Sequence, residues 1–460
     1  MVFVPHTEEE RREMLAAIGV ARLEDLFGDV PERHRYPELG LPEPLSEMEI
    51  MRELNELSDA NLNANAVPTF LGAGAYRHWT PAVVDYVISR GEFYTAYTPY
   101  QAEVSQGTLQ AIFEYQSLIC DLTDMDVANA SHYDGATAAA EAVIQAINKF
   151  RMKRHKIVLA PTLHPHYRAV IRTYLQGMEL EIVGDEDLDR PLDDVVELVD
   201  DNTACILFQS PNFFGEMEDL GSLVENVRAQ DKKALIAVAT NPISLGLFTP
   251  PGAYGVDIVL GEGQPLGLGL NFGGPYLGFY ATSKKQMRQI AGRLVGETED
   301  EEGKRGYVLT LTTREQHIRR ERATSNICTN QGLMALAATA YMSALGKQGL
   351  RKVAELNYHK AHYAAEQIDG IEGFRVLTQK PFFNEFVVEC PASVETINNF
   401  LLTDWPFDII GGFDLSRVYP ERESQMLIAV TEMNTRNEID DFVHALAEYA
   451  DHMTGGNHHE

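Results

Sequence analysis

Between residues 120 and 283, short runs of apolar and β-branched residues alternate with stretches of helical periodicity. This alternation is typical of strands joined by helical crossovers, which form a parallel sheet covered by helices on both faces. The pattern therefore predicts an α/β fold built around one large sheet. The expected strands are "KIVLAP", "LEIVG", "ACILFQSP", "ALIAVA", "DIVLG" and "YLGFYAT".

Different patterns flank this region. Thr7 with Glu10, and Ser46 with Glu49, match the capping box, so two amphipathic helices are expected to begin near residues 8 and 47. Towards the C-terminus, a long helical stretch leads to the apolar runs "FNEFVVEC" and "QMLIAVTE". We therefore expect three parts: a helical arm over residues 1–65, a large α/β domain over 66–335 and a small α+β domain over 336–460.

Charge and composition argue against several classes of protein. The chain has 68 acidic and 38 basic residues and a formal net charge of −30, so the phosphates of nucleic acids and anionic lipids would repel it. It contains no run of about 18 apolar residues and no apolar stretch typical of a signal peptide. Its four cysteines are scattered without metal-binding spacing or pairing, which suits a reducing cytoplasm. We expect a cytoplasmic protein that binds no metal, membrane or nucleic acid.

The segment "VDIVLGEGQPLGLGLNFGGPYLGFYAT" (residues 256–282) reads as a strand, a tight turn, a glycine-rich loop and a second strand. In enzymes that hold pyridoxal phosphate (PLP) on a large parallel sheet, the Schiff-base lysine lies at the end of the first strand. Gln264 takes that place here, and residues 234–283 contain no Lys, Arg or His. The run "ALIAVATNPISLG" also lacks the aspartate that keeps the pyridine nitrogen protonated in such enzymes. We therefore expect no catalytic residue in this chain.

Two further segments have the form of loops that hold a cofactor. Asp134, Gly135, Ala136 and Thr137 open a helix of small residues, which suits either a phosphate cup, or its remnant, or a tightly packed alanine-rich helix. The loop "TLHPHYRAVIRTY" places His164 two residues before a second histidine. An aromatic ring there could stack on a pyridine, whereas a metal site would need a third ligand, which the sequence nearby does not offer.

Aromatic and basic residues cluster outside these loops. Six aromatic residues occur between Phe93 and Tyr115, which indicates either a core-packing loop or a binding surface, because tyrosines are enriched at interfaces. Upstream, "FLGAGAYRHWTPAVV" suits a glycine loop that faces another surface. A cluster of arginines is suited either to a phosphate or carboxylate ligand or to salt links between subunits or domains. Its members are Arg305, Arg314, Arg319, Arg320 and Arg322.

The chain resembles the glycine decarboxylase P-protein of the glycine cleavage system over essentially its whole length, and four segments carry this resemblance. The chain is most similar to the amino-terminal half of that protein, which in many bacteria is a separate subunit 1 (alpha). The segments are "YTAYTPYQAEVSQG" (94–107), "DGATAAAEA" (134–142), "VDIVLGEGQPLG…FGGP" (256–275) and "ERATSNICTNQ" (321–331).

This resemblance implies the aspartate-aminotransferase-like PLP-transferase fold (fold type I), with a mainly parallel seven-stranded sheet in the large domain. It implies a heterotetramer of two alpha and two beta subunits, in which a lysine of beta (subunit 2) binds PLP. Glycine would be decarboxylated in beta, and its aminomethyl group passed to the lipoyl arm of H-protein. Since active sites of this fold lie at dimer interfaces, we expect Tyr97, Tyr100 and Gln101 to wall the beta site or its lipoyl entrance.

Two other functions remain open. The chain could be a scaffold or docking platform for H-protein, with no influence on the chemistry in beta. It could also be an independent PLP-dependent lyase or aminotransferase that uses an unexpected lysine such as Lys284.

Overall fold

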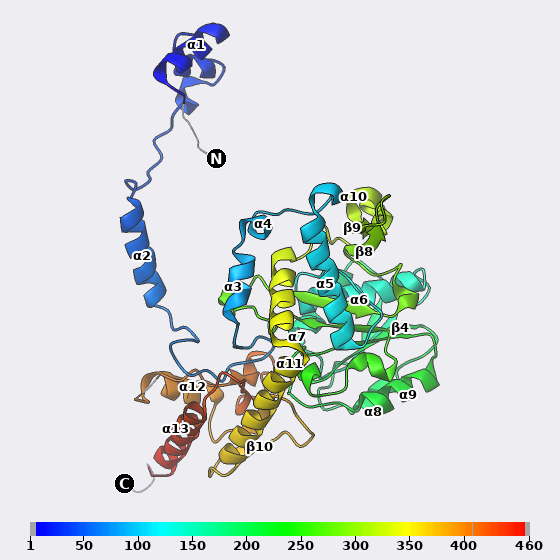
Figure 1. Ribbon diagram of the computed structural model, residues 1–460. Helices are drawn as coiled ribbons and strands as arrows, with labels where there is room; N and C mark the ends of the chain where they lie inside the picture. Colours follow the sequence, from blue (N-terminus) through cyan, green and yellow to red (C-terminus); the bar gives the residue numbers. More distant parts are fainter. Residues whose placement is uncertain (1–5, 407, 456–460) are drawn as a thin grey trace. The chain divides into compact units, whose positions relative to one another are not determined.

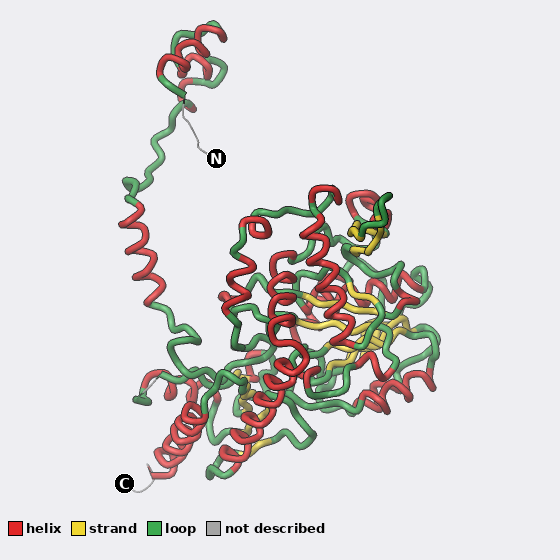
Figure 2. The backbone as a smooth tube through the Cα atoms, viewed as in Figure 1, coloured by secondary structure: helices red, strands yellow, loops and turns green. Residues whose placement is uncertain are grey.

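The computed structural model describes residues 6–406 and 408–455 (Figure 1, Figure 2). The chain separates into two compact units, one that ends at Leu62 and one that begins at Asn63, and each is described by itself. Within the described residues, no helix is both long enough and apolar enough to cross a membrane.

The first unit contains two helices, α1 (Glu8–Ile18) and α2 (Glu47–Asp59). Thr7 caps α1 and Ser46 caps α2, each in a reciprocal capping box, which confirms both predicted helix starts. Neither helix has a buried residue, so their stability comes from local bonds rather than from a core of their own. Between them lie two short helical turns, η1 (Leu23–Phe27) and η2 (Glu32–His34).

A seven-stranded sheet with the order β1-β7-β6-β5-β4-β2-β3 forms the centre of the second unit. Neighbouring strands from β6 to β3 are parallel, whereas β7 is antiparallel to β6 and β1 is antiparallel to β7. The predicted mainly parallel sheet is confirmed, and each of the six predicted runs forms a strand. The strands are β1 (Val127–Ala128), β2 (Lys156–Leu159), β3 (Glu181–Val183), β4 (Thr203–Gln209), β5 (Leu235–Ala239), β6 (Ile258–Glu262) and β7 (Gly278–Thr282).

Helices cover both faces of this sheet (Figure 1). Successive strand residues point to opposite faces, so Ile157 and Ile258 pack with α6 and α7, whereas Val158 and Val259 pack with α5, α9 and α11. The main helices of the second unit's large sheet are α5 (Gln106–Thr123), α6 (Gly135–Lys149), α7 (Pro165–Leu175), α8 (Leu192–Val196), α9 (Leu220–Gln230) and α11 (Gly332–Asp369). Shorter helical segments are α3 (Ala82–Ile88), α4 (Gly91–Tyr94), α10 (Gln316–Arg319), η3 (Ala102–Val104), η4 (Ser244–Gly246), η5 (Pro251–Tyr254), η6 (Asn271–Gly273), η7 (Lys284–Gln286), η8 (Thr312–Arg314) and η9 (Arg320–Arg322).

The hairpin of β8 (Leu294–Glu299) and β9 (Arg305–Thr310) was not predicted from the sequence. Two glutamines of α5 hold it. The Gln106 amide bonds the backbone N–H and C=O of Tyr307 at 2.9 and 2.8 Å, and the Gln116 amide bonds those of Val295 at 3.0 and 2.9 Å. Each side-chain amide thus pairs with a strand residue as the backbone of a neighbouring strand would.

A second, antiparallel sheet lies in the C-terminal part, with the order β10-β11-β13-β12, and it contains both predicted C-terminal runs. Helix α11 connects the two sheets. Its residues up to Ala354 pack into the core of the large sheet and those from Ala361 onwards into that of the small sheet, and the helix is broken at Gly346, where φ is +60°. The expected boundary between residues 335 and 336 falls within the first turn of α11. The remaining elements are β10 (Arg375–Val376), β11 (Glu385–Glu389), α12 (Val394–Thr403), β12 (Phe413–Asp414), η10 (Leu415–Arg417), β13 (Gln425–Ala429) and α13 (Arg436–Gly455).

One carboxyl group is buried in the core on α6. The Glu141 side chain accepts a hydrogen bond of 2.6 Å from the Ser325 hydroxyl, and its second oxygen has no partner among the described residues. Burial raises the pKa of Glu141 to about 7. The folded state therefore binds this proton more tightly than the unfolded state does, and the contribution of Glu141 to stability is lost as the pH rises towards 7.

We expect Glu141→Gln to flatten the pH dependence of stability. Between pH 5 and pH 8, the free energy of unfolding of the variant should fall by roughly 1–3 kcal/mol less than that of the wild type, because a neutral amide has no proton to lose. Urea unfolding at several pH values measures this difference. The matched control is Glu225→Gln, an exposed site on α9. Parallel profiles for Glu141→Gln and the wild type would contradict the assignment.

Candidate functional site

Four strands of the large sheet end around a small cavity, here called the strand-end pocket. His164 follows β2, Gln209 ends β4, Thr240 follows β5 and Glu262 ends β6, and all four line the cavity. The carboxyl ends of parallel strands are where α/β sheets bind ligands. The volume of this cavity is about 40 Å³, whereas pockets for organic ligands usually measure about 300–1,000 Å³. The strand-end pocket has room for no more than a few water molecules.

Gln264 lies beside this pocket and is fully buried. Its side-chain oxygen accepts a hydrogen bond of 2.9 Å from the backbone N–H of Tyr76. Its side-chain nitrogen donates to the carbonyls of Tyr76 (2.8 Å) and Leu268 (2.9 Å). The amide therefore acts as a cross-link to a segment 188 residues earlier in the chain.

The segment Phe70–Trp79, here called the plug segment, lies against the strand-end pocket. The Ala73 N–H and the Tyr76 hydroxyl donate to the two oxygens of Glu385 at 2.7 and 2.6 Å. The Ala73 carbonyl lies 2.8 Å from Nε2 of His164. At Gly74, where φ is +109°, a Cβ atom would lie 2.8 Å from that same nitrogen, so the close approach requires glycine.

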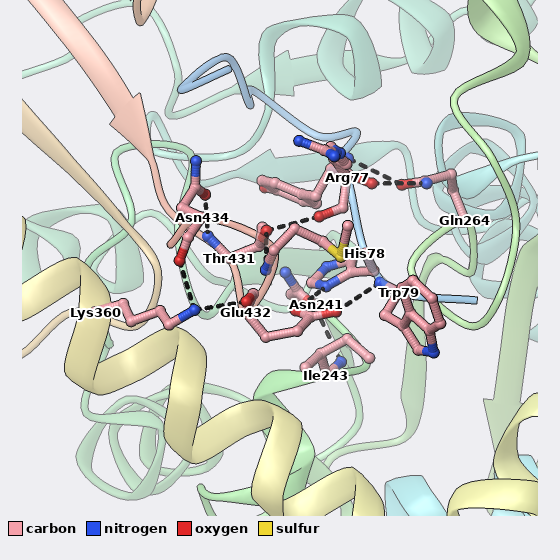
Figure 3. A network of polar contacts seen from close by, with 12 residues as sticks. Arg77, His78, Trp79, Asn241, Ile243, Gln264, Lys360, Thr431, Glu432 and Asn434 are labelled. Atoms are coloured by element: carbon pink, nitrogen blue, oxygen red, sulfur yellow. Dashed lines mark hydrogen bonds and ion pairs between the residues drawn. The ribbon is translucent and has the colours of Figure 1, made fainter. Parts of the chain in front are cut away.

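The C-terminal part holds the other side of the plug segment (Figure 3). Thr431 donates to the carbonyl of Arg77 at 2.7 Å. Glu432 accepts from the backbone N–H of Trp79 at 2.7 Å, and its other oxygen lies 2.8 Å from Nδ1 of His78. The expectation that this glycine loop faces another surface is therefore wrong for Tyr76, which is buried within its own chain, while Trp79 is 61% exposed.

The start of α6 is closed by groups of the same chain. Asp134 and Thr137 form a reciprocal capping box, with an Asp134 oxygen 2.8 Å from the Thr137 N–H. The Gly135 N–H donates to a carboxylate oxygen of Glu262 at 3.0 Å. A Cβ atom on Gly135 would lie 1.9 Å from the hydroxyl of Tyr167. The position at which a helix N-terminus would bind a phosphate is thus filled by a carboxylate and a phenol.

Glu262 accepts three backbone hydrogen bonds, the other two from Gln264 and Leu277, each at 3.0 Å. Burial raises the pKa of Glu262 to about 7, although the three N–H donors favour its ionised form. Glu385 is buried as well, and burial raises its pKa to about 7. Two carboxyl groups of raised pKa therefore flank the pocket.

The two histidines of the loop after β2 have structural partners. Nε2 of His164 donates to the carbonyl of Ala73, and Nδ1 accepts the backbone N–H of His166 at 3.1 Å. The ring also stacks on Tyr167, with ring centroids 5.2 Å apart. Burial lowers the pKa of His164 to about 4, so the ring is neutral. Among the described residues, no group of three or more His, Cys, Asp or Glu side chains could hold a metal ion.

The tyrosine-rich loop before α5 lies at the surface, where Tyr97 is 83% and Tyr100 50% exposed, and Gln101 is also exposed. The hydroxyl of Tyr100 accepts a hydrogen bond of 3.3 Å from Arg293, and the Arg293 guanidinium lies 5.4 Å from the ring centroid. Arg293 is only 2% exposed and also donates to Thr329. This buried arginine, which the sequence patterns did not single out, fixes an exposed tyrosine to the segment "ERATSNICTNQ".

The arginine cluster does not converge on one ligand. Arg314 donates to the carbonyls of Ile290 and Gly292 and has a structural role. Arg319, Arg320 and Arg322 are exposed. Sequence reasoning also missed Phe272, which is 94% exposed in the glycine-rich loop after Gln264 and has a φ of +53°.

We expect Gln264→Leu to lower the free energy of unfolding by roughly 2–4 kcal/mol, because three buried backbone groups lose their partners. Urea unfolding followed by circular dichroism measures this loss. The matched control is Gln145→Leu, since Gln145 is also buried but its side chain accepts a single hydrogen bond, from Tyr280. Equal losses in the two variants would contradict a special role for Gln264.

Comparison with known proteins identifies the family. The family model described as "Glycine cleavage system P-protein" matches residues 1–446. A protein of Thermomicrobium roseum, named "Probable glycine dehydrogenase (decarboxylating) subunit 1", is 55% identical over 451 residues, which are 97% of this chain and 99% of that protein.

Two solved structures support the same family and its fold. A crystal structure of glycine decarboxylase (P-protein) of the glycine cleavage system, in inhibitor-bound form, matches with a TM-score of 0.87 and 43% identity, covering 97% of this chain and 100% of that one. An aspartate aminotransferase of Thermus thermophilus matches with a TM-score of 0.55 and 12% identity over 84% of this chain and 99% of its own, which shows a common fold alone. The expected fold type I is confirmed, and the chain belongs to the glycine cleavage system P-protein family.

Proposed function

We propose that this chain is the non-catalytic subunit of a two-subunit glycine decarboxylase, and that its partner subunit carries PLP. The observation that carries this proposal is the cross-link made by Gln264, whose amide occupies the strand end where an enzyme of this fold would need a lysine. Relatives over nearly the full length are named as subunit 1 of the enzyme, so a partner subunit is part of the assembly.

Proteins of this family depend on PLP, but the strand-end pocket does not suit that cofactor. Its lining includes no lysine, and its volume of about 40 Å³ is far too small for a ring and a phosphate. The N-terminus of α6 already binds the carboxylate of Glu262. The strand-end pocket therefore has a structural role in this chain and takes no part in the chemistry.

Exposed apolar side chains support the presence of a partner. Tyr97, Val104 and Phe272 are 83%, 79% and 94% exposed, and burial of such side chains favours association. In the first unit, none of the residues of α2 is buried, and its apolar side chains Met48 and Leu54 are 74% and 55% exposed. These surfaces suit contacts between subunits.

The proposed assembly contains two copies of this chain and two of the partner. The partner subunit would decarboxylate glycine and pass the aminomethyl group to the lipoyl arm of H-protein. Tyr97, Tyr100 and Gln101 of this chain would wall the partner's active site or the entrance for the lipoyl arm, because their side chains are exposed while Arg293 holds Tyr100 in place. The role proposed for this chain is thus to complete a site whose reacting groups belong to its partner.

Exchange of labelled bicarbonate into the carboxyl group of glycine tests this division of labour. We expect no exchange by this chain alone, with or without added PLP and H-protein, and exchange by the purified complex of the two subunits. Exchange by the isolated chain would refute the proposal.

A second prediction concerns the tyrosine-rich loop. Tyr100→Phe removes one hydroxyl and keeps the ring, so the complex should assemble as before but lose about fivefold in kcat/KM for glycine or for H-protein, the effect of one hydrogen bond. The control is Tyr254→Phe, a tyrosine 39% exposed in η5. Unchanged kinetics for Tyr100→Phe would favour the scaffold alternative.

A further inference from the structure

A second cavity lies at the amino edge of the large sheet, opposite to the edge where Gln264 lies. Its volume is about 830 Å³. The turn before β5, the residues that lead into β6 and the residues that follow the antiparallel β7 all line it, together with the end of α6. We call it the amino-edge cavity. It is concave, formed by several elements and within the size range of about 300–1,000 Å³ typical of ligand sites.

Lysines dominate the charge of this cavity. Five of the chain's twelve lysines line it, in a chain of net charge −30. They come from three separate parts of the sequence, and among the described residues none of their ammonium groups has an ion-pair partner. The five are Lys149, Lys232, Lys233, Lys284 and Lys285.

The acidic side chains at the cavity do not neutralise these lysines. Asp257 pairs with Arg228 at 2.7 Å and accepts the backbone N–H of Ile236 at 3.0 Å. Asp126 accepts the backbone N–H of Lys284 at 2.8 Å. Asp124, the third acid, is exposed at the end of α5. With Arg228, six cationic side chains face three carboxylates, so the cavity has a net positive charge.

One of the lysines is partly desolvated, and its ammonium group lies 5.4 Å from the ring centroid of Phe150. Lys149 is half-buried at the end of α6, and burial lowers the pKa of its ammonium group, against the attraction of the Asp257 carboxylate. A partly desolvated cation without an ion-pair partner is costly, and a bound anion would offset that cost. The other four lysines are exposed, and their flexible side chains line the same cavity.

We propose that the amino-edge cavity is a binding site for a small polyanion, a molecule that carries two or more phosphate or carboxylate groups. Lysine ammonium groups bind such groups as point charges, and several of them around one cavity suit several charges on one ligand. A compact ligand fits better than a nucleic acid or an anionic membrane, because the strongly acidic remainder of the chain would repel a long or extended polyanion.

Calorimetric titration of the full chain with sodium tripolyphosphate and with citrate tests this site. We expect saturable binding of one ligand per chain that persists at about 150 mM NaCl, where exposed charges are largely screened beyond roughly 8 Å. Tighter binding of tripolyphosphate would identify phosphate groups as the preferred chemistry, and tighter binding of citrate would identify carboxylates. The absence of saturable binding of both would overturn the proposal.

Charge variants locate the site. The double variant Lys232→Gln/Lys285→Gln changes two exposed side chains at the cavity and should weaken binding about tenfold or more. Its matched control is Lys347→Gln/Lys352→Gln, which makes the same charge change at exposed positions of α11. Equal affinities of the two double variants would overturn the proposal. A third result would also overturn the proposal: the wild-type chain binds no anion, and Lys232→Gln/Lys285→Gln loses binding to the partner subunit. The cavity would then be a contact with that subunit.

Discussion

The hydrogen bonds between the Gln264 amide and the backbone of Tyr76 connect parts of the fold that no strand pairing connects. The amide both donates and accepts, so one side chain satisfies the N–H and the C=O of the same buried residue. A lysine ammonium group has three donors and no acceptor, so it could not accept the hydrogen bond from the Tyr76 N–H. Because Tyr76 then reaches Glu385 of the small sheet, this pair of bonds also links the two sheets. Gln264 therefore has a structural role at the strand end.

The tyrosine-rich loop before α5, which we propose faces a partner, also depends on a buried polar side chain. Tyr100 is half exposed, yet a buried arginine and the edge of His317 hold its ring. Arg293 in turn donates to the backbone of Cys328 and the side chain of Thr329, so the loop before α5 and the segment before α11 share one anchor. A side chain fixed before association loses less entropy on binding than a free one. This arrangement supports the proposed role of the chain, which is to shape a site rather than to react in it.

Periodicity in the sequence predicted most of the fold. All six strands with apolar runs were predicted, whereas β1 has two residues and the β8–β9 hairpin exposes much of its polar surface, so neither gives a clear pattern. The absence of lysine from residues 234–283 was visible because an absent residue type can be read along one segment. Its structural consequence was not, since the partner of Gln264 lies 188 residues away and bonds through its backbone. For the same reason, side-chain chemistry alone placed Tyr76 at a surface, although Glu385 binds it in the interior.

The position of Glu262 has a consequence for any attempt to restore a cofactor site in this chain. Its carboxylate lies on the first N–H of α6, and the Tyr167 hydroxyl occupies the space above Gly135. A phosphate could bind at this helix only if both groups were absent from that position. A lysine introduced at position 264 alone would therefore meet a filled cavity, whereas removal of the two groups first would leave N–H groups of α6 without acceptors. On the proposed function, restoring a cofactor site to this chain would need two or more simultaneous substitutions, which a single point mutation cannot provide.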